Sequence, residues 1–294
     1  HFSNLSIPDA SDVVLTTIFK SILGGYLGAA GFVDVVKRKA DHIVSASILL
    51  YRGIVQEMRP TPSKSHYTFN MRDLSRVFQG ITRVAASSVK DADMLCDIWA
   101  HENCRVFQDR LICSEDKDWF SNELVTVAKQ KLGVKWDVDR IMGVPSEHYT
   151  PLLWADFLVP GTDAADRTYD PVPSWSKCKG LVADYLSEYN YSGSRTMDLV
   201  LFKDCIEHVL RMSRILHTPR GNALLVGVGG SGKQSVTRLA AHLAEFKLFT
   251  VELTKGYGIA EFREDLKEME DLKEMYEAAG VNDTPIVFLF TEAQ

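Results

Sequence analysis

The glycine-rich stretch 227-GVGGSGKQS-235 constrains the fold of this sequence more than any other feature. It follows a short apolar run, 223-ALLVG-227, which we expect to be a buried strand, and it precedes a segment of helical periodicity over about 233–246. Glycines permit the positive-φ turns that point several backbone N–H groups at one anion, and the start of a helix adds partial positive charge. A strand, a glycine loop, a lysine and a helix in this order predict a phosphate-binding loop.

The residues of this loop predict a purine nucleotide, ATP or ADP, as the ligand. Lys233 is the expected point charge for the β- and γ-phosphates. The next position normally carries a Ser or Thr hydroxyl that binds Mg²⁺, but here it is Gln234, so that hydroxyl is displaced to Ser235 or missing. Phosphate binding is therefore predicted more firmly than Mg²⁺ binding. The candidate nucleotide-binding residues are Gly227, Gly229, Gly230, Ser231, Gly232, Lys233, Gln234 and Ser235.

The acidic element that should accompany such a loop is also altered. A P-loop ATPase ends a buried strand with an Asp that holds the metal shell and often a Glu that polarises water. Here the strand 286-IVFLF-290 runs into Thr291, Glu292 and Ala293. Either Glu292 replaces the Asp and Ala293 stands in the catalytic position, or Glu292 is the catalytic Glu and Thr291 replaces the Asp. Glu292 is the candidate catalytic residue, and Ser235 and Glu292 are the candidate metal ligands; the alternative is that Glu292 is a solvated strand end.

The second half of the chain alternates between helical and apolar extended patterns. Continuous apolar strands of this kind, separated by helices, indicate a parallel sheet covered on both faces. We expect helices over 179–190, 197–217, 233–246 and about 260–279, and strands over 223–227, 247–253 and 286–290.

The first 135 or so residues have helical periodicity throughout. Asn70 is the expected N-cap of one helix, with Asp73 at its third position, and Gly133 closes another. Prolines crowd residues 136–175, which we interpret as a linker with a domain boundary near residue 140. The expected helices include 45–58, 71–84, 94–112 and 115–132.

Charge and cysteine content exclude several other classes of protein. The net charge of −6 does not favour nucleic acid or an anionic membrane as a partner, and no apolar run approaches the roughly 18 residues of a membrane span. The five cysteines have no CxxC spacing and are typical of free thiols in a reducing cytosol. His101 and Cys104 share helical spacing that permits a shared metal, although no second pair of ligands follows.

Four blocks of sequence resemble one protein family, the axonemal dynein heavy chains. These blocks are 70-NMRDLSRVFQG-80, 101-HENCRVFQDRL-111, 197-MDLVLFKDCIEHVLRMSRIL-216 and 221-GNALLVGVGGSGKQS-235. The resemblance implies an AAA+ motor ring of six modules. Residues 1–140 would then be the α-helical small subdomain that ends a third module. Residues 141–294 would be the α/β P-loop part of a fourth module, an incomplete parallel sheet with flanking helices.

The same resemblance implies roles and partners. Arg72 matches a sensor arginine that would touch the γ-phosphate of another module's nucleotide; the alternative is a surface arginine. The intact family member is a minus-end-directed microtubule motor of cilia and flagella, located in the cytoplasm on the axonemal cytoskeleton. Its expected partners are neighbouring AAA+ modules and, through the intact heavy chain only, intermediate chains, light chains and microtubules; no nucleic acid or membrane is expected.

We expect the site to bind nucleotide in a structural or regulatory role, with negligible hydrolysis by this chain alone. The altered Mg²⁺ position and acidic pair favour this, and by the resemblance the arginine finger and sensor I segments lie beyond Gln294. One alternative is an orphan interaction or assembly module with an empty P-loop, and another is an active stand-alone ATPase. The segment 264-EDLKEM-269 repeats directly as 270–275, and the sequence does not explain this duplication.

Overall fold

The chain forms two compact units. A computed structural model describes residues 3, 5–6, 8–142, 152–163, 166–192, 196–250, 258–259, 279–281 and 284–291. The helical unit comprises His1–Trp154 and Thr168–Trp175, and the P-loop unit comprises Ala155–Arg167 and Ser176–Gln294. The chain therefore passes from one unit to the other three times.

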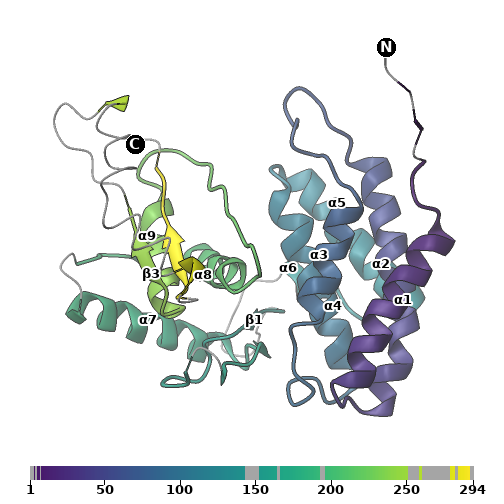
Figure 1. Cartoon of the computed structure of the whole chain (residues 1–294), viewed down its shortest axis with the longest axis horizontal. Helices are drawn as coiled ribbons and strands as arrows, with labels where there is room; N and C mark the ends of the chain where they lie inside the picture. Colours follow the sequence, from purple (N-terminus) through teal and green to yellow (C-terminus); the bar gives the residue numbers. More distant parts are fainter. Residues whose placement is uncertain are drawn as a thin grey trace. The chain divides into compact units, whose positions relative to one another are not determined.

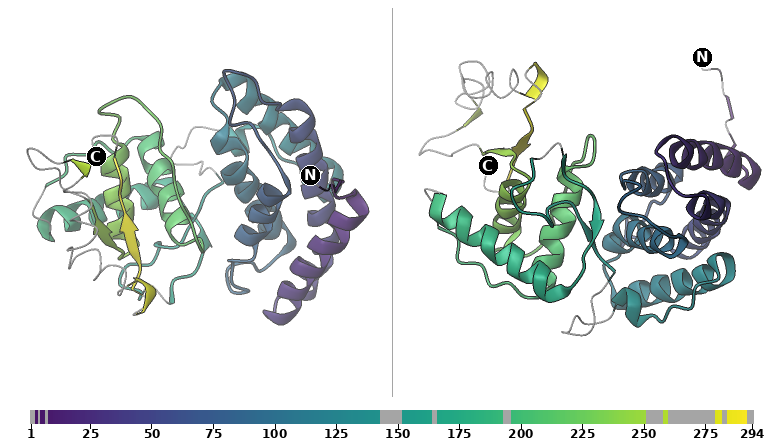
Figure 2. Two further views of the ribbon diagram at one scale, coloured as in Figure 1. Left: turned by 45° about the horizontal axis from the view of Figure 1, so that its top comes forward. Right: turned by 90° about the horizontal axis from the view of Figure 1, so that it is seen from below.

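Side-by-side helices build the helical unit (Figures 1 and 2). Helix α1 packs on α2 and α3, and α2 packs in turn on α4 and α5. Spacing of three or four residues puts apolar side chains on one face of each helix, and in α1 that face is Leu15, Phe19, Leu23 and Leu27, all buried. The elements are α1 (Asp12–Ala29), α2 (Asp34–Glu57), α3 (Met71–Ile81), α4 (Ala92–Val106), η1 (Gln108–Arg110), α5 (Ser114–Val127), η2 (Ala128–Leu132) and α6 (Asp139–Met142).

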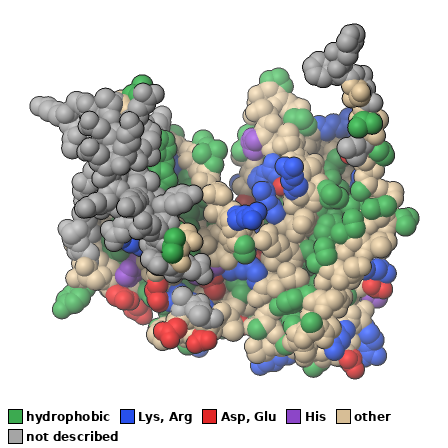
Figure 3. Space-filling model, viewed as in Figure 1, with side chains coloured by type: hydrophobic (Ala, Val, Ile, Leu, Met, Phe, Trp, Pro, Cys, Tyr) green, Lys and Arg blue, Asp and Glu red, His purple; other side chains and the backbone are tan. Residues whose placement is uncertain are grey.

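Helix α1 also carries apolar side chains on a second face. Val14, Ile18 and Ile22 repeat at four-residue spacing and are exposed, as is Val13. Figure 3 shows hydrophobic side chains gathered over this helix. Helix α1 is therefore apolar around much of its circumference, as helices buried on two sides are.

The predicted start of α3 is confirmed. Asn70 Oδ1 accepts a hydrogen bond from the Arg72 backbone N–H at 2.9 Å, and Asp73 Oδ2 accepts one from the Asn70 N–H at 3.0 Å. This reciprocal capping box satisfies donors that a helix start otherwise leaves unpaired. The helix ends at Ile81, three residues before the predicted end.

The predicted helix 94–112 is not continuous. Helix α4 ends at Val106, and a 3-10 turn, η1, follows it. The break buries Phe107 completely and turns Gln108 so that its Nε2 donates to Ser121 Oγ of α5 at 2.9 Å. Tertiary contacts thus end α4 at Val106, although the helical pattern of the sequence continues to residue 112. The helix predicted over 115–132 is confirmed as α5 with a final π turn, η2, closed by Gly133 in the left-handed region.

The two sequence blocks at 70–80 and 101–111 meet in the core of the helical unit. The Arg110 Nη1 lies 3.1 Å from Asp73 Oδ1, and the Arg110 guanidinium stacks over Phe69. The fully buried Glu102 carboxyl group lies against Gly80 of α3, where an added Cβ would stand 1.7 Å from Glu102 Oε2. Glycine at position 80 is therefore required by this close approach.

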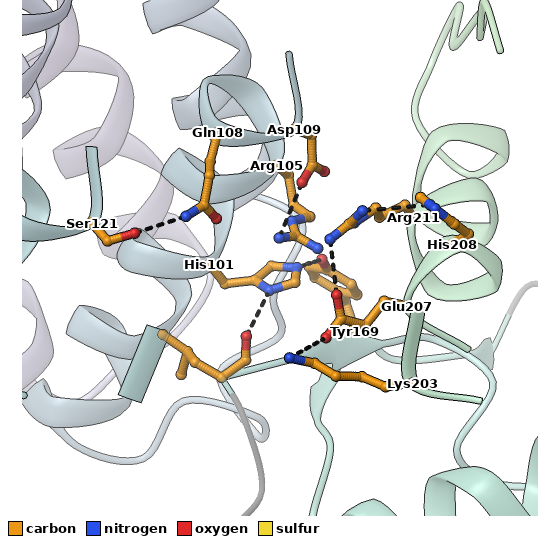
Figure 4. Close-up of polar contacts among 11 residues, drawn as sticks. His101, Arg105, Gln108, Asp109, Ser121, Tyr169, Lys203, Glu207, His208 and Arg211 are labelled. Carbon is orange, nitrogen blue, oxygen red and sulfur yellow. Dashed lines mark hydrogen bonds and ion pairs between the residues drawn. The ribbon is translucent and has the colours of Figure 1, made fainter. Parts of the chain in front are cut away.

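A buried polar cluster fixes the returning segment Thr168–Trp175 to the helical unit. His101 Nε2 lies 2.9 Å from the Tyr169 hydroxyl (Figure 4). The same hydroxyl donates to Glu102 Oε1 at 3.1 Å. His101 Nδ1 lies 3.3 Å from the Leu152 carbonyl. Because these contacts occupy both imidazole nitrogens, His101 serves packing here. Among the described residues, no three His, Cys, Asp or Glu side chains form a group that could hold a metal ion, and His101 and Cys104 belong to no such group.

The described residues of the P-loop unit form three long helices and a short parallel sheet. Helix α8 packs on α9, and α9 packs on β3 (Figure 1). Strands β3 and β4 pair in parallel, with Leu248 opposite Val287, which confirms two predicted strands and their direction. The elements are α7 (Trp175–Ser192), α8 (Lys203–Leu216), α9 (Lys233–Leu243), β3 (Lys247–Phe249) and β4 (Ile286–Phe288). A separate two-stranded sheet, whose residues lie mostly in the helical unit, joins β1 (Trp154–Ala155) and β2 (Asp170–Pro171).

Two predictions for this unit are wrong. The helix expected from residue 197 begins at Lys203, because Asn190 exchanges two hydrogen bonds with the Met197 backbone and holds it out of the helix. The buried strand expected over 223–227 has no strand partner among the described residues. The side chains of Leu224 and Val226 are 91% and 88% exposed. An apolar segment becomes buried in a sheet only when neighbouring strands form hydrogen bonds with it, and no described strand does so here. The predicted helix over 260–279 lies almost wholly outside the described residues, as does the duplicated EDLKEM segment.

Replacement of Gly80 by Ala should destabilise the helical unit. The new methyl group would overlap the Glu102 carboxylate, and overpacking of this kind costs about 1–3 kcal/mol. The matched control is Gly25→Ala in α1, where an added Cβ meets nothing within 4 Å; there we expect a gain of about 0.5–1 kcal/mol from reduced backbone freedom. Urea denaturation followed by circular dichroism measures both, and equal effects of the two changes would refute the close-approach argument.

Acid should weaken the start of α5 through Asp116. Burial tends to raise the pKa of this carboxyl, but hydrogen bonds from Cys113, Lys64 and Tyr67 outweigh it and lower the pKa below the ordinary 3.8. The stabilisation is therefore present above pH 3.8 and is lost as pH falls through the lowered folded pKa. Asp116→Asn should reduce the unfolding free energy at neutral pH, and its difference from the natural chain should shrink below pH 3.8. The exposed Asp118→Asn is the control, and an unchanged difference across this pH series would contradict the assignment.

Candidate nucleotide-binding site

The glycine loop ends in the backbone geometry that exposes N–H groups. Gly230 and Gly232 have φ of 76° and 80°, in the left-handed region that glycine tolerates. Gly232 is the N-cap of α9 and has no side chain to cap the helix, so the first turn from Lys233 onward presents its N–H groups and the positive end of the helix dipole. The predicted start of this helix at residue 233 is confirmed.

The Lys233 side chain folds back onto its own loop, and its ammonium group forms hydrogen bonds there. Its Nζ donates to the Gly227 carbonyl at 2.6 Å, to the Val228 carbonyl at 2.7 Å and to Ser231 Oγ at 3.2 Å. A Cβ at Gly227 would lie 3.3 Å from Ser231 Oγ, so the loop is tight at this point. All three acceptors are neutral, and Lys233 has no ion pair within the described part of the chain. Its charge is therefore left for an anion.

The remaining candidate residues lie in the loop, in the first turn of α9, after β4 and outside the described residues. Gln234 is exposed in the first turn of α9, Ser235 beside it is half-buried, and an added Cβ at Gly229 would meet nothing within 4 Å. Thr291 follows β4 and is half-buried. Glu292, the candidate catalytic residue and metal ligand, lies outside the described residues. The structure thus brings Gly227, Ser231 and Lys233 into contact, and the role of Glu292 stays a prediction.

The far end of α9 is held by an arginine that the sequence did not single out. Arg167 Nη1 donates to the Leu243 carbonyl at 2.5 Å, its Nε donates to the Thr162 carbonyl, and its Nη2 pairs with Glu245. A cation at a helix C-terminus satisfies the last carbonyls and complements the dipole. Arg167 lies 76 residues from Leu243 in sequence, so no local pattern could have indicated this contact.

Helix α8, which packs on α9, is fixed by a second buried charge. The Asp156 carboxylate accepts a hydrogen bond from Ser213 Oγ at 2.9 Å, and its other oxygen lies 2.9 Å from His217 Nδ1. Near the other end of α8, Glu207 pairs with Lys203 and Arg211 at helical spacing (Figure 4). Two anchors from one short segment, Asp156 and Arg167, therefore hold the helices that position the loop.

Arg72 lies at the N-terminus of α3 with an exposed side chain. The capping box next to it fixes its backbone. The sensor role that the resemblance implies for this arginine stays a prediction.

The described loop carries an excess of positive charge, which suits a negatively charged group. Left-handed glycines, an uncapped helix start and an uncompensated ammonium all favour negative charge. The position that usually supplies a metal-binding hydroxyl carries Gln234, whose amide group donates as well as accepts.

None of the helices in the described part of the chain combines the length and apolar character needed to cross a bilayer.

Comparison with known proteins assigns both units. Residues 16–117 match the family model described as "Dynein heavy chain, ATPase lid domain", and residues 197–294 match "P-loop containing dynein motor region D4". Human dynein axonemal heavy chain 6 is 42% identical over 294 residues, which is all of this chain and 7% of the relative. Human dynein axonemal heavy chain 1 is 41% identical, again over the whole chain and 7% of the relative. The Chlamydomonas reinhardtii dynein-1-beta heavy chain of the flagellar inner arm I1 complex is 40% identical, over the whole chain and 6% of the relative.

The glycine loop, the parallel strand pair and these matches define an AAA+ P-loop module preceded by a helical lid. The chain belongs to the dynein heavy-chain family, in its axonemal branch, and corresponds to a segment of the motor region. It spans about 7% of the length of the curated relatives that it matches first.

Proposed function

We propose that this segment binds ATP or ADP at the loop of residues 227–235 and hydrolyses it little. The observation that supports this most directly is the Lys233 ammonium at the uncapped start of α9, where it contacts neutral oxygens only. An anion bound at this turn would be stabilised by the helix dipole, by hydrogen bonds from the backbone N–H groups and by the lysine charge. The nucleotide then has a structural or regulatory role.

The larger role follows from the relatives. Their names describe axonemal and flagellar dynein heavy chains. We infer that the protein containing this segment acts as a microtubule motor on the cytoskeleton of the axoneme, with the segment in its ring of AAA+ modules. Neighbouring modules are then its direct partners. Intermediate chains, light chains and microtubules are partners only of the intact heavy chain.

A second function, an assembly module with an empty loop, is favoured by one observation. The Lys233 ammonium already has three acceptors within the loop, so the loop is internally satisfied without a ligand. Nucleotide retained through purification and released on denaturation would separate the two functions. Its absence, together with no binding of added nucleotide, would favour the assembly role.

Lys233→Ala should weaken nucleotide binding without unfolding the chain. The variant removes a charged hydrogen bond worth roughly 1.5–3 kcal/mol but keeps the backbone cradle, so affinity should fall about tenfold to a hundredfold. Isothermal titration calorimetry with ADP and ATP measures the change. Lys179→Ala on the exposed side of α7 is the matched control and should bind as the natural chain does. Equal affinity of the two variants would show that the loop is not the site.

Turnover should be negligible in this chain. Gln234 occupies the position of the metal-binding hydroxyl, and Thr291 or Ala293 occupies the position of one paired carboxylate. Because each such group contributes orders of magnitude to phosphoryl transfer, the rate should lie far below about 1 per second. A phosphate-release assay measures it, with Lys233→Ala to reveal contaminating ATPase. Turnover near that rate which disappears in the Lys233 variant would contradict the prediction and would make Glu292 a working base.

A further inference from the structure

The first turn of α9 places an amide where a metal-binding hydroxyl is expected. Gln234 is the second residue of the helix and is exposed. The adjacent Ser235 does not substitute for a hydroxyl at 234, because successive residues of an α-helix point about 100° apart around its axis. A Mg²⁺ ion at a nucleotide site requires near-octahedral oxygen ligands close to the phosphates. Position 234 offers one neutral amide oxygen on a long, flexible side chain.

The charge around the loop also favours an anion over a cation. Lys233 contacts only carbonyl and hydroxyl oxygens, and it has no carboxylate partner among the residues that the structure describes. The helix start adds further positive charge. In that same part of the chain, no three His, Cys, Asp or Glu side chains form a group able to hold a metal ion. Among the described residues, a divalent cation at the loop would therefore rely mainly on phosphate oxygens for its ligands.

A glutamine amide can supply what the metal would otherwise supply. Its NH₂ group donates two hydrogen bonds, and an exposed position in the first helical turn lets it reach an anion held by the neighbouring N–H groups. A hydroxyl at this position would bind the metal through its oxygen, whereas the amide can bind a phosphate oxygen directly. At position 234, Gln would thus contact phosphate, whereas Ser or Thr would contact the metal.

We propose that this site binds the metal-free form of the nucleotide, and that Gln234 sets this preference by contacting phosphate in place of Mg²⁺. The inference rests on the proposed function, because it takes phosphate binding at residues 227–235 as given. The ligand class is a nucleoside di- or triphosphate without a divalent cation. A site of this kind keeps its nucleotide when free Mg²⁺ is removed.

The test compares nucleotide affinity with and without Mg²⁺ in the full chain. ADP and ATP are titrated by calorimetry in excess Mg²⁺ and in EDTA, with the natural chain, Gln234→Thr and Gln234→Ser. The natural chain should bind at least as tightly in EDTA as in Mg²⁺. Gln234→Thr should bind about tenfold tighter in Mg²⁺ than in EDTA, since it regains one charge-assisted ligand. Gln130→Thr, at an exposed position of η2, is the matched control and should keep the natural behaviour.

The outcomes separate this inference from the proposed function. Tighter binding of the natural chain in Mg²⁺ by tenfold or more would overturn the inference and leave nucleotide binding intact. Equal affinities of Gln234→Thr in the two buffers would overturn the role given to Gln234. No binding in either buffer would overturn the proposed function, and the inference with it. Circular dichroism of each variant confirms that the fold is retained.

Discussion

The uncapped positive end of α9 is the feature on which the rest of the P-loop unit depends. A helix start without a side-chain cap leaves several N–H groups without acceptors, and here the preceding residue is a left-handed glycine that cannot cap it. The surrounding contacts hold this end in place: Arg167 binds the opposite terminus of α9, and Asp156 fixes α8, on which α9 packs. A rigid support for an unsatisfied helix end is what a phosphate site requires.

The helical unit is built on a different constraint, which is the satisfaction of buried charge. Glu102 is fully buried and lies between Gly80 and the Tyr169 hydroxyl. Asp73 caps α3 and pairs with Arg110. A buried carboxylate without such partners would cost several kcal/mol, so these contacts tie the helices together in one arrangement. Four of the residues involved, Asp73, Gly80, Glu102 and Arg110, lie in the two sequence blocks at 70–80 and 101–111.

Local patterns predicted the local features of this fold, and long-range contacts decided the others. The glycine loop, the start of α9, the Asn70–Asp73 capping box and the parallel strands β3 and β4 could be predicted because each depends on neighbours in sequence or on a continuous apolar run. The exposure of Leu224, the break after Val106 and the Arg167 contact could not, because each is set by residues distant in sequence or by the lack of a strand partner among the described residues. The contacts of Lys233 with its own loop likewise depend on side-chain placement that no sequence pattern specifies.

The interleaved course of the chain limits how this segment can be dissected. Because Thr168–Trp175 belongs to the helical unit, a protein cut once near residue 140 would lose Tyr169 from that unit. His101 and Glu102 would then lose the hydroxyl that each contacts. An expression boundary chosen from the apparent linker would therefore yield a helical domain in which the buried polar groups of His101 and Glu102 lack the hydroxyl of Tyr169. The low stability of that fragment would result from the position of the cut. A boundary after residue 175 keeps Tyr169 in the helical domain.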